Sequence, residues 1–287
     1  MTVSASAAHN IARVLSKRGF CSRKQAVAYV LAGRVKLNGR TVRDPGERVL
    51  NADKIQVDGK TAAAHGKIYI ILNKPAGCVT TRSDELGRKT VYDYLGDMGQ
   101  WVFPVGRLDL ESEGLLLFTN DTAFGNRLTD PRYKTPRTYE VTLDGALAPA
   151  ALDNIRRGGV AIGRGETTGP ASVTVIDEKT GACTVKITLA EGKNRELRRL
   201  FEVFNRKVLR LLRTDFGGYK LGSTAAGRWR SCAPPDAAAT HGICTGRPGP
   251  RDRRKTPSKT RPPAHVRPTR RNGRQRPMAW RGANVVN

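Results

Sequence analysis

Residues 106–117 of the chain read Gly-Arg-Leu-Asp-Leu-Glu-Ser-Glu-Gly-Leu-Leu-Leu. Within this stretch an arginine and an aspartate, Arg107 and Asp109, lie two positions apart just before an apolar run. Because side chains alternate along an extended chain, the spacing predicts these two on one face and Leu108 and Leu110 on the other. A carboxylate beside a guanidinium stays ionised, which is what a nucleophilic carboxyl group requires.

Strand patterns outnumber helix patterns on either side of this stretch. We predict helices over about 148–157 and 194–204. Because the strands do not alternate regularly with helices, the sequence favours an α+β fold, a mostly antiparallel mixed sheet with flanking helices, over a doubly wound parallel sheet. The predicted strands are 68–72, 115–118, 139–143, 172–176 and 184–189.

Residues 9–60 carry a different pattern, typical of a small helix–helix–strand module. Apolar residues at helical spacing predict a first helix near 11–15, and Ser22 can cap a second helix over 23–32. Short alternating segments with Asn-Gly and Asp-Gly turn signals follow, near 35–39 and 54–59. We read residues 61–67 as a linker.

The charge of the chain points to a polyanionic partner. Lys and Arg number 51 against 25 Asp and Glu, a formal charge of +26, and nucleic acid is the natural partner for such an excess. Residues 235–287 hold 13 Lys and Arg, 2 Asp and Glu and 8 of the 16 prolines, which predicts a disordered basic tail. No apolar run is long enough to span a bilayer, and residues 1–10 lack a secretory pattern. We therefore expect a cytoplasmic protein that has no membrane partner.

Cysteine and histidine usage narrows the chemistry. The cysteines are odd in number and form no C-x-x-C pair, which predicts reduced thiols and neither a disulfide framework nor a zinc site. They are Cys21, Cys78, Cys183, Cys232 and Cys244. All histidines lie outside residues 68–234, which argues against histidine acid–base catalysis there. They are His9, His65, His241 and His265.

The N-terminal module resembles the S4 RNA-binding domain. Three runs carry the resemblance: Ile-Ala-Arg-Val-Leu at 11–15, Cys-Ser-Arg-Lys-Gln-Ala at 21–26 and Ala-Gly-Arg-Val-Lys-Leu-Asn-Gly at 32–39. In that family a helical face holds the phosphates of structured RNA, so the resemblance implies a set of RNA-binding cations. They are Arg13, Arg18, Arg23, Lys24 and Arg34.

The stretch at 106–117, followed by Thr-Asn-Asp at 119–121, resembles the catalytic motif of pseudouridine synthases of the small-subunit and the B/E/F large-subunit type. The resemblance implies that Asp109 is the nucleophile. It also implies that Arg107 enters the RNA helix in place of the extruded base.

Three further segments resemble the same family: Asn-Lys-Pro-Ala-Gly at 73–77, Pro-Arg-Thr-Tyr-Glu-Val at 136–141, and Glu-Gly-Lys-Asn-Arg-Glu-Leu-Arg-Arg-Leu at 191–200. Arg137 departs from the family pattern. The resemblance implies that Tyr139 packs against the uracil, as an aromatic plane can. The other implied roles are a salt bridge from Arg198 to Asp109, Leu197 beneath the base, and substrate binding by Lys74, Lys193, Asn194 and Arg195.

Together these resemblances imply isomerisation of a uridine in ribosomal RNA, with the base flipped from its stack and no cofactor or metal. The 23S RNA of the large subunit is the preferred substrate, and the 16S RNA stays open. The expected partners are ribosomal RNA or ribosome assembly intermediates, and we expect a monomer. The expected domains are RNA-binding at 9–60 and catalytic at 68–234.

Two other readings remain open at this point. The first is a metal-dependent RNA-cleaving enzyme, since carboxylate clusters bind Mg²⁺. Its ligands would be Asp109, Glu111, Glu113 and Asp121. The second is a non-catalytic RNA-binding assembly factor, in which the S4-like module and the basic tail are the whole purpose of the chain.

Overall fold

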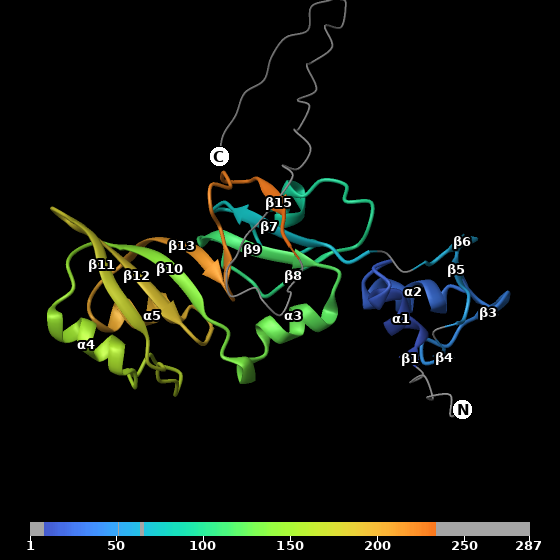
Figure 1. The fold of residues 1–287 in the computed structure, drawn as a ribbon, viewed down its shortest axis with the longest axis horizontal. Helices are drawn as coiled ribbons and strands as arrows, with labels where there is room; N and C mark the ends of the chain where they lie inside the picture. The colour runs from blue at the N-terminus through green and yellow to red at the C-terminus, as the bar shows by residue number, and fades with distance from the viewer. Residues whose placement is uncertain (1–8, 51, 64–65, 234–287) are drawn as a thin grey trace, which may run out of the picture. The chain divides into compact units, whose positions relative to one another are not determined.

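The computed structural model of the chain describes residues 9–50, 52–63 and 66–233. The disordered tail predicted at 235–287 lies outside the described residues. The helices and strands named below can be followed in Figure 1.

The N-terminal module contains the two predicted helices, α1 (Ile11–Lys17) and α2 (Arg23–Leu31). As predicted, Ser22 caps α2: its hydroxyl accepts from the Gln25 amide at 3.1 Å, and the Gln25 side chain accepts from the Ser22 amide at 3.0 Å. An antiparallel sheet of four short strands follows, in the order β3-β2-β5-β6, and β1 pairs with β4. The strands are β1 (His9–Asn10), β2 (Val35–Leu37), β3 (Arg40–Val42), β4 (Arg48–Val49), β5 (Ile55–Val57) and β6 (Lys60–Thr61).

A nine-stranded mixed sheet forms the centre of the second part, residues 66–233. Its order is β11-β12-β10-β13-β9-β7-β15, with β14 on β13 and β8 on β9. Every pairing is antiparallel except that of β13 with β9, so the expected α+β fold with a mostly antiparallel mixed sheet is confirmed. The strands are β7 (Tyr69–Lys74), β8 (Phe103–Pro104), β9 (Glu113–Thr119), β10 (Arg137–Leu143), β11 (Ser172–Lys179), β12 (Ala182–Leu189), β13 (Val208–Phe216), β14 (Tyr219–Lys220) and β15 (Trp229–Ser231).

The parallel junction between β9 and β13 depends on Gly114. Its φ is +101°, and an added Cβ would lie 2.3 Å from the carbonyl oxygen of Arg213. Only glycine allows the backbones to approach this closely at the start of β9. The junction fixes where the stretch at 106–112, which leads into β9, meets β13.

The apolar run in β9 is buried on both sides of the sheet. Leu115 and Leu117 pack on one face with Phe124 from α3 (Thr122–Thr129), while Leu116 and Phe118 pack on the other face. The second face is covered by residues 78–108, which include the short 3₁₀ helix η1 (Val91–Tyr94). A strand covered on both faces reads as a continuous apolar run, which explains the pattern in the sequence.

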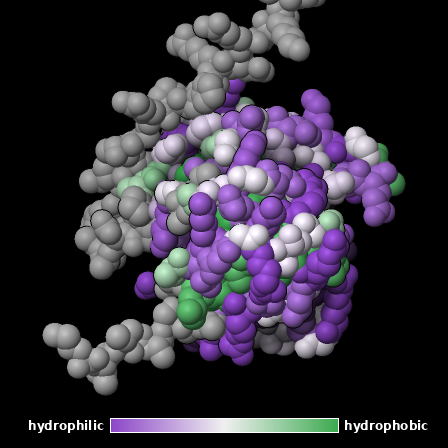
Figure 2. Space-filling view, turned by 90° about the vertical axis from the view of Figure 1, so that its right-hand side faces the viewer, coloured by the Kyte–Doolittle hydropathy of each residue, from purple (hydrophilic) through white to green (hydrophobic). Residues whose placement is uncertain are grey.

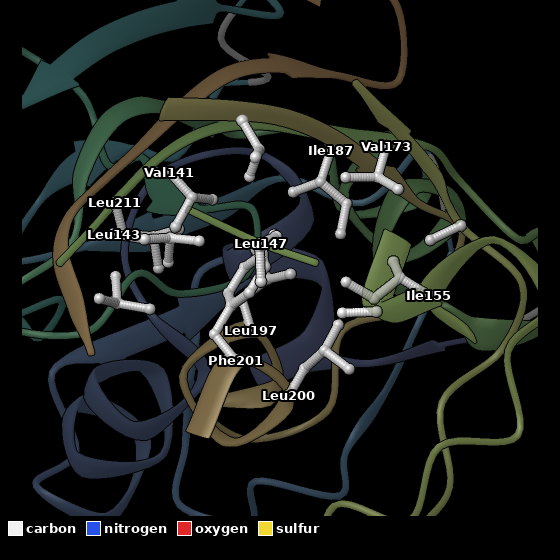
Figure 3. Packing of buried hydrophobic residues seen from close by; sticks show 14 of the residues in the cluster. Val141, Leu143, Leu147, Ile155, Val173, Ile187, Leu197, Leu200, Phe201 and Leu211 are labelled. Carbon is white, nitrogen blue, oxygen red and sulfur yellow. The ribbon is translucent and has the colours of Figure 1, made fainter. Parts of the chain in front are cut away.

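A second core forms where α4 (Pro149–Arg157) and α5 (Glu196–Val203) pack on β10 to β13. Figure 3 shows Leu197, Leu200 and Phe201 of α5 gathered with side chains from the strands. Both predicted helices are therefore confirmed, with ends within two residues. The packing holds the beginning of α5 against the sheet.

Three of the cysteines, Cys21, Cys78 and Cys183, are buried thiols with no disulfide in the described residues. Cys244 lies outside them. Across residues 9–50, 52–63 and 66–233, no helix is long and apolar enough to cross a membrane.

Candidate active site

Asp109 lies in the loop that joins β8 to β9, and the backbone on either side of it is fixed by hydrogen bonds. The Thr80 hydroxyl donates to the carbonyl oxygen of Leu108 at 2.7 Å and accepts from its amide at 3.3 Å. The Gly77 amide donates to the carbonyl oxygen of Leu110 at 2.8 Å. These bonds hold the backbone around Asp109 in place, and none of them involves a carboxylate.

The predicted alternation of this stretch is partly wrong. Leu108 is buried while Arg107 and Asp109 face a pocket, as expected, but Leu110 is 38% exposed. The reason is that the chain turns at 110–111 and does not become a strand until Glu113. The two-residue period of an extended strand therefore ends at Asp109.

Lys74, at the end of β7, supports the same loop through hydrogen bonds of its side chain. Its side chain is fully buried, and its ammonium donates to the carbonyl oxygens of Pro75 at 3.1 Å, Leu110 at 3.3 Å and Ser112 at 2.8 Å. Burial lowers the pKa of Lys74. The predicted substrate-binding role does not fit this geometry, because Lys74 does not line the pocket and its three donors are all engaged.

A pocket of about 460 Å³ lies beside the loop. Strands β10 and β13 and the segment at 189–198 complete its walls. Eight of the nine residues predicted to be catalytic or substrate-binding line it. They are Arg107, Asp109, Tyr139, Lys193, Asn194, Arg195, Leu197 and Arg198.

Tyr139 and Leu197 supply an aromatic and an aliphatic surface in this pocket. Tyr139 is half-buried on β10, between Ile187 of β12 and Arg213 of β13 in the register of the sheet. Leu197 is 4% exposed in the first turn of α5 and belongs to the core beneath the pocket. A flat heterocycle can pack between such surfaces.

Arg198 does not pair with Asp109 as predicted. Its guanidinium instead lies 3.4 Å from a carboxylate oxygen of Glu111 and donates to the carbonyl oxygen of Val208 at 3.3 Å. Arg195 approaches the same Glu111 oxygen at 3.6 Å. Within the described part of the chain, Asp109 has no ion pair within 4 Å. Glu111, which lies in the turn at 110–111, is therefore the carboxylate that both arginines meet.

The segment before α5 is held by charged groups. The Lys193 ammonium contacts Glu191 at 2.5 Å and donates to the carbonyl oxygen of Thr167 at 2.6 Å, while the Gly169 amide donates to Glu191 at 2.5 Å. Lys193 is therefore occupied by protein groups. Asn194 is exposed, and its side chain accepts from Arg164 at 3.2 Å.

Glu196 is a functional candidate that the sequence analysis missed. It lines the pocket although it is only 4% exposed; one carboxyl oxygen accepts from the Lys193 amide at 2.9 Å, and the other has no donor within the described residues. Burial and the hydrogen bond to Glu191 raise the pKa of Glu196 to about 7. Burial disfavours ionised Glu191 as well, but hydrogen bonds from Glu196 and Lys193 outweigh it and lower its pKa. Burial and the neighbouring Glu191 thus favour the protonated form of Glu196 in the pocket wall.

Two further arginines line the pocket, and neither was predicted to do so. The guanidinium carbons of Arg137 and Arg213 lie 5.0 and 4.7 Å from the centroid of the Phe216 ring. Arg213 is 3% exposed and donates to the carbonyl oxygen of Leu115 at 2.8 Å. In the sequence Arg137 stood out only as a departure from the family pattern, and nothing singled out Arg213.

The carboxylates of the metal-dependent reading do not gather in one place. Glu111 contacts the arginines described above, Glu113 pairs with Arg210 at 2.9 Å, and Asp121 pairs with Lys67 at 2.6 Å and caps α3. No group of three or more potential metal ligands forms among the residues described. The particular ligand set of that reading is therefore wrong.

The cations predicted to bind RNA in the N-terminal module fall into two groups. Arg13, Arg23 and Lys24 are exposed on the two helices. Arg18 instead donates to the backbone carbonyls of residues 53 and 62, and Arg34 pairs with Asp58. Hydrophilic residues also cover most of the molecular face in Figure 2.

Comparison with protein families gives two matches that agree with this geometry. Residues 68–203 match RNA pseudouridylate synthase, and residues 11–55 match the S4 domain. The first match contains the loop of Asp109 and the beginning of α5, and the second contains the N-terminal helices.

Characterised and uncharacterised relatives match most of the length of the chain. It is 33% identical over 236 residues to ribosomal large subunit pseudouridine synthase B of Bacillus subtilis, covering 80% of this chain and 96% of the relative. It is 38% identical over 223 residues to an uncharacterised RNA pseudouridine synthase of Aquifex aeolicus, covering 77% and 88%.

The fold comparison agrees. A solved pseudouridylate synthase crystal structure superposes with a TM-score of 0.56 at 27% identity, covering 78% of this chain and 96% of that one. With the sequence relatives and the family matches, this similarity establishes that the chain belongs to the S4-domain-containing RNA pseudouridine synthases, enzymes that isomerise uridine in RNA.

Proposed function

We propose that this enzyme isomerises one specific uridine of ribosomal RNA, with 23S RNA of the large subunit as the preferred substrate and 16S RNA as the alternative. The Bacillus subtilis relative, which acts on the large subunit by its name, supports the preference. The formal charge of +26 also favours a large, structured polyanion. The expected product is the same RNA with uracil rejoined to ribose through C5.

One observation carries the proposal: Arg107 and Asp109 of the loop between β8 and β9, Tyr139 of β10 and Leu197 of α5 line one pocket. In the proposed mechanism the target uridine leaves its stack at a cost of a few kcal/mol, and Arg107 fills part of the gap. Tyr139 and Leu197 hold the uracil. Asp109 then initiates cleavage of the N1–C1′ bond, and the detached base rotates and rejoins.

Arg198 is assigned the role of keeping Asp109 anionic once RNA is bound. Its present partner Glu111 is 60% exposed, so water competes with a contact of 3.4 Å. A nucleotide that enters the pocket covers the loop and excludes water, which favours a new contact between Arg198 and Asp109, because electrostatic interactions grow where water is excluded. The proposal therefore includes an exchange of partners by Arg198 on binding.

The proposal extends to the organisation of the chain. Residues 9–60 bind RNA, mainly through Arg13, Arg23 and Lys24, and residues 68–234 carry out catalysis. The enzyme acts as a cytoplasmic monomer without a metal or cofactor, on ribosomal RNA or on assembly intermediates. The buried thiols support a reducing compartment.

The test maps pseudouridine in all ribosomal RNAs of cells that lack this protein. We expect the loss of one modification, restored by the wild-type gene and not by Asp109→Asn. A complete set of pseudouridines in the deleted strain would contradict the proposal. If the Asp109→Asn gene restored ribosome assembly in that strain, assembly would depend on binding and not on the modification.

A further inference from the structure

A second pocket lies next to the catalytic one, on the exposed side of α3. Its volume is about 380 Å³, and it is lined by α3 and the following short 3₁₀ helix η2 (Pro131–Tyr133). Thr129 lines both pockets, so they share one wall. Arg137, which lines the catalytic pocket, also donates to the carbonyl oxygen of Leu128 in α3 at 3.4 Å. The two pockets are therefore adjacent.

Tyr133 provides an aromatic surface at this second pocket. The residue is 58% exposed, and no hydrogen bond to its hydroxyl forms within the described ranges. The guanidinium of the neighbouring Arg132 pairs with the carboxylate of Asp130 at 2.6 Å and not with the ring. An exposed aromatic ring held on a short helix is the kind of surface on which a nucleobase stacks.

Two polar side chains of α3 accompany the ring. Arg127 and Asn126 are exposed and line the pocket, and neither side chain has a hydrogen bond or ion pair in the part of the chain that is described. A guanidinium can contact a phosphate, and an amide can read the edge of a base. The pocket thus offers a partner for the base, for its edge and for its phosphate.

We propose that the pocket lined by Asn126, Arg127 and Tyr133 binds an unstacked nucleotide that neighbours the target uridine. The inference rests on the proposed function. Extrusion of a uridine leaves the adjacent bases without a stacking partner on one side. A protein ring beside the catalytic pocket replaces that partner and lowers the cost of extrusion, while Arg127 contacts the phosphate.

The test measures the binding of a hairpin RNA that the wild-type enzyme modifies, at fixed salt. A second and a third hairpin carry an abasic residue on the 5′ or the 3′ side of the target. We expect Tyr133→Ala to raise the Kd for the intact hairpin about tenfold, in line with the loss of one stacked base. Tyr133→Phe keeps the ring and should stay within about twofold.

On one of the two abasic hairpins, wild type and Tyr133→Ala should bind equally, because the base that stacks is already missing. Arg127→Gln should weaken binding and reduce the salt slope by about one. Leu86→Ala serves as the control, since Leu86 is 76% exposed and lines none of the pockets described above.

The inference is overturned if Tyr133→Ala binds the intact hairpin as wild type does, or if its loss of affinity is the same on all three hairpins. Failure of the proposed function would look different, because wild-type protein would then form no pseudouridine in any ribosomal RNA. If the wild-type enzyme modifies the hairpin and Tyr133→Ala binds it as tightly as wild type does, only the proposal for the second pocket is contradicted.

Discussion

The two walls of the catalytic pocket are held in different ways. The loop that carries Asp109 is anchored through backbone groups, by Thr80, Gly77 and the buried Lys74. The segment that leads to Arg198 is held by carboxyl groups, chiefly Glu191 and its partner Glu196.

The position of Asp109 and the charge of the opposite wall therefore depend on different groups. The Asp109 loop has no carboxyl group among its anchors, so its geometry does not depend on pH over the range in which carboxyl groups titrate. The opposite wall contains a proton that leaves near neutral pH, because a second buried negative charge beside Glu191 is costly. The nucleophile is thus placed on the fixed wall, and the charged partner on the wall that titrates.

Removing the anchor of the fixed wall should have the largest effect. Lys74→Met keeps the volume but removes the ammonium that donates to the carbonyl oxygens of Pro75, Leu110 and Ser112. We expect the free energy of unfolding to fall by about 2–4 kcal/mol, because buried acceptors lose their hydrogen bonds. Urea denaturation measures the change. Lys89→Met, at an exposed position in the same part of the chain, is the control, and equal stability of the two variants would contradict the role of Lys74.

The titrating wall should respond to Glu196→Gln. The folded pKa of Glu196, about 7, lies above its ordinary value of 4.5, so the folded state binds more protons between these values. The contribution of this group to stability is therefore complete at low pH and is lost as the pH rises through about 7, with a slope of up to about 1.4 kcal/mol per pH unit. Glutamine cannot titrate, so the stability of the variant should be less dependent on pH in this window.

Urea unfolding at a series of pH values between 4.5 and 8 tests this expectation. Glu202→Gln, an exposed carboxyl group on the same helix, should reproduce the wild-type curve. Parallel curves for wild type and Glu196→Gln would contradict the raised pKa of Glu196.

The contact between the two walls should matter least. Glu111 is 60% exposed, and such ion pairs contribute about 0–1 kcal/mol. We expect Glu111→Gln to change kcat/KM by no more than about threefold, whereas Arg198→Gln lowers it by much more. A loss in Glu111→Gln that equals the loss in Arg198→Gln would show that Glu111, and not Asp109, is the functional partner of Arg198.

Local patterns in the sequence predicted much of the fold. Ser22 marked the beginning of α2, and the continuous apolar run of β9 predicted a buried strand. Strand β13 was missed because several charged residues lie inside it, Arg213 among them. That arginine is buried against Phe216, and a charged residue in the middle of a strand hides the apolar pattern on which the prediction depends.

The site was predicted as a set of residues but not as a set of contacts. Which carboxylate Arg198 meets depends on a turn at 110–111, and that turn depends on Lys74, 36 positions away along the chain from Leu110. The raised pKa of Glu196 depends on burial that only the packed helix α5 creates. Such features come from tertiary structure, so a local pattern does not reveal them.

The most direct test of the central assignment is the turnover of Asp109→Asn on an RNA that the wild-type enzyme modifies, measured together with RNA affinity. We predict product formation below about one per cent of the wild-type rate with a Kd within about threefold, because the loss of a nucleophile costs orders of magnitude in rate and little in binding. Residual turnover well above one per cent, with RNA binding intact, would contradict the assignment of Asp109.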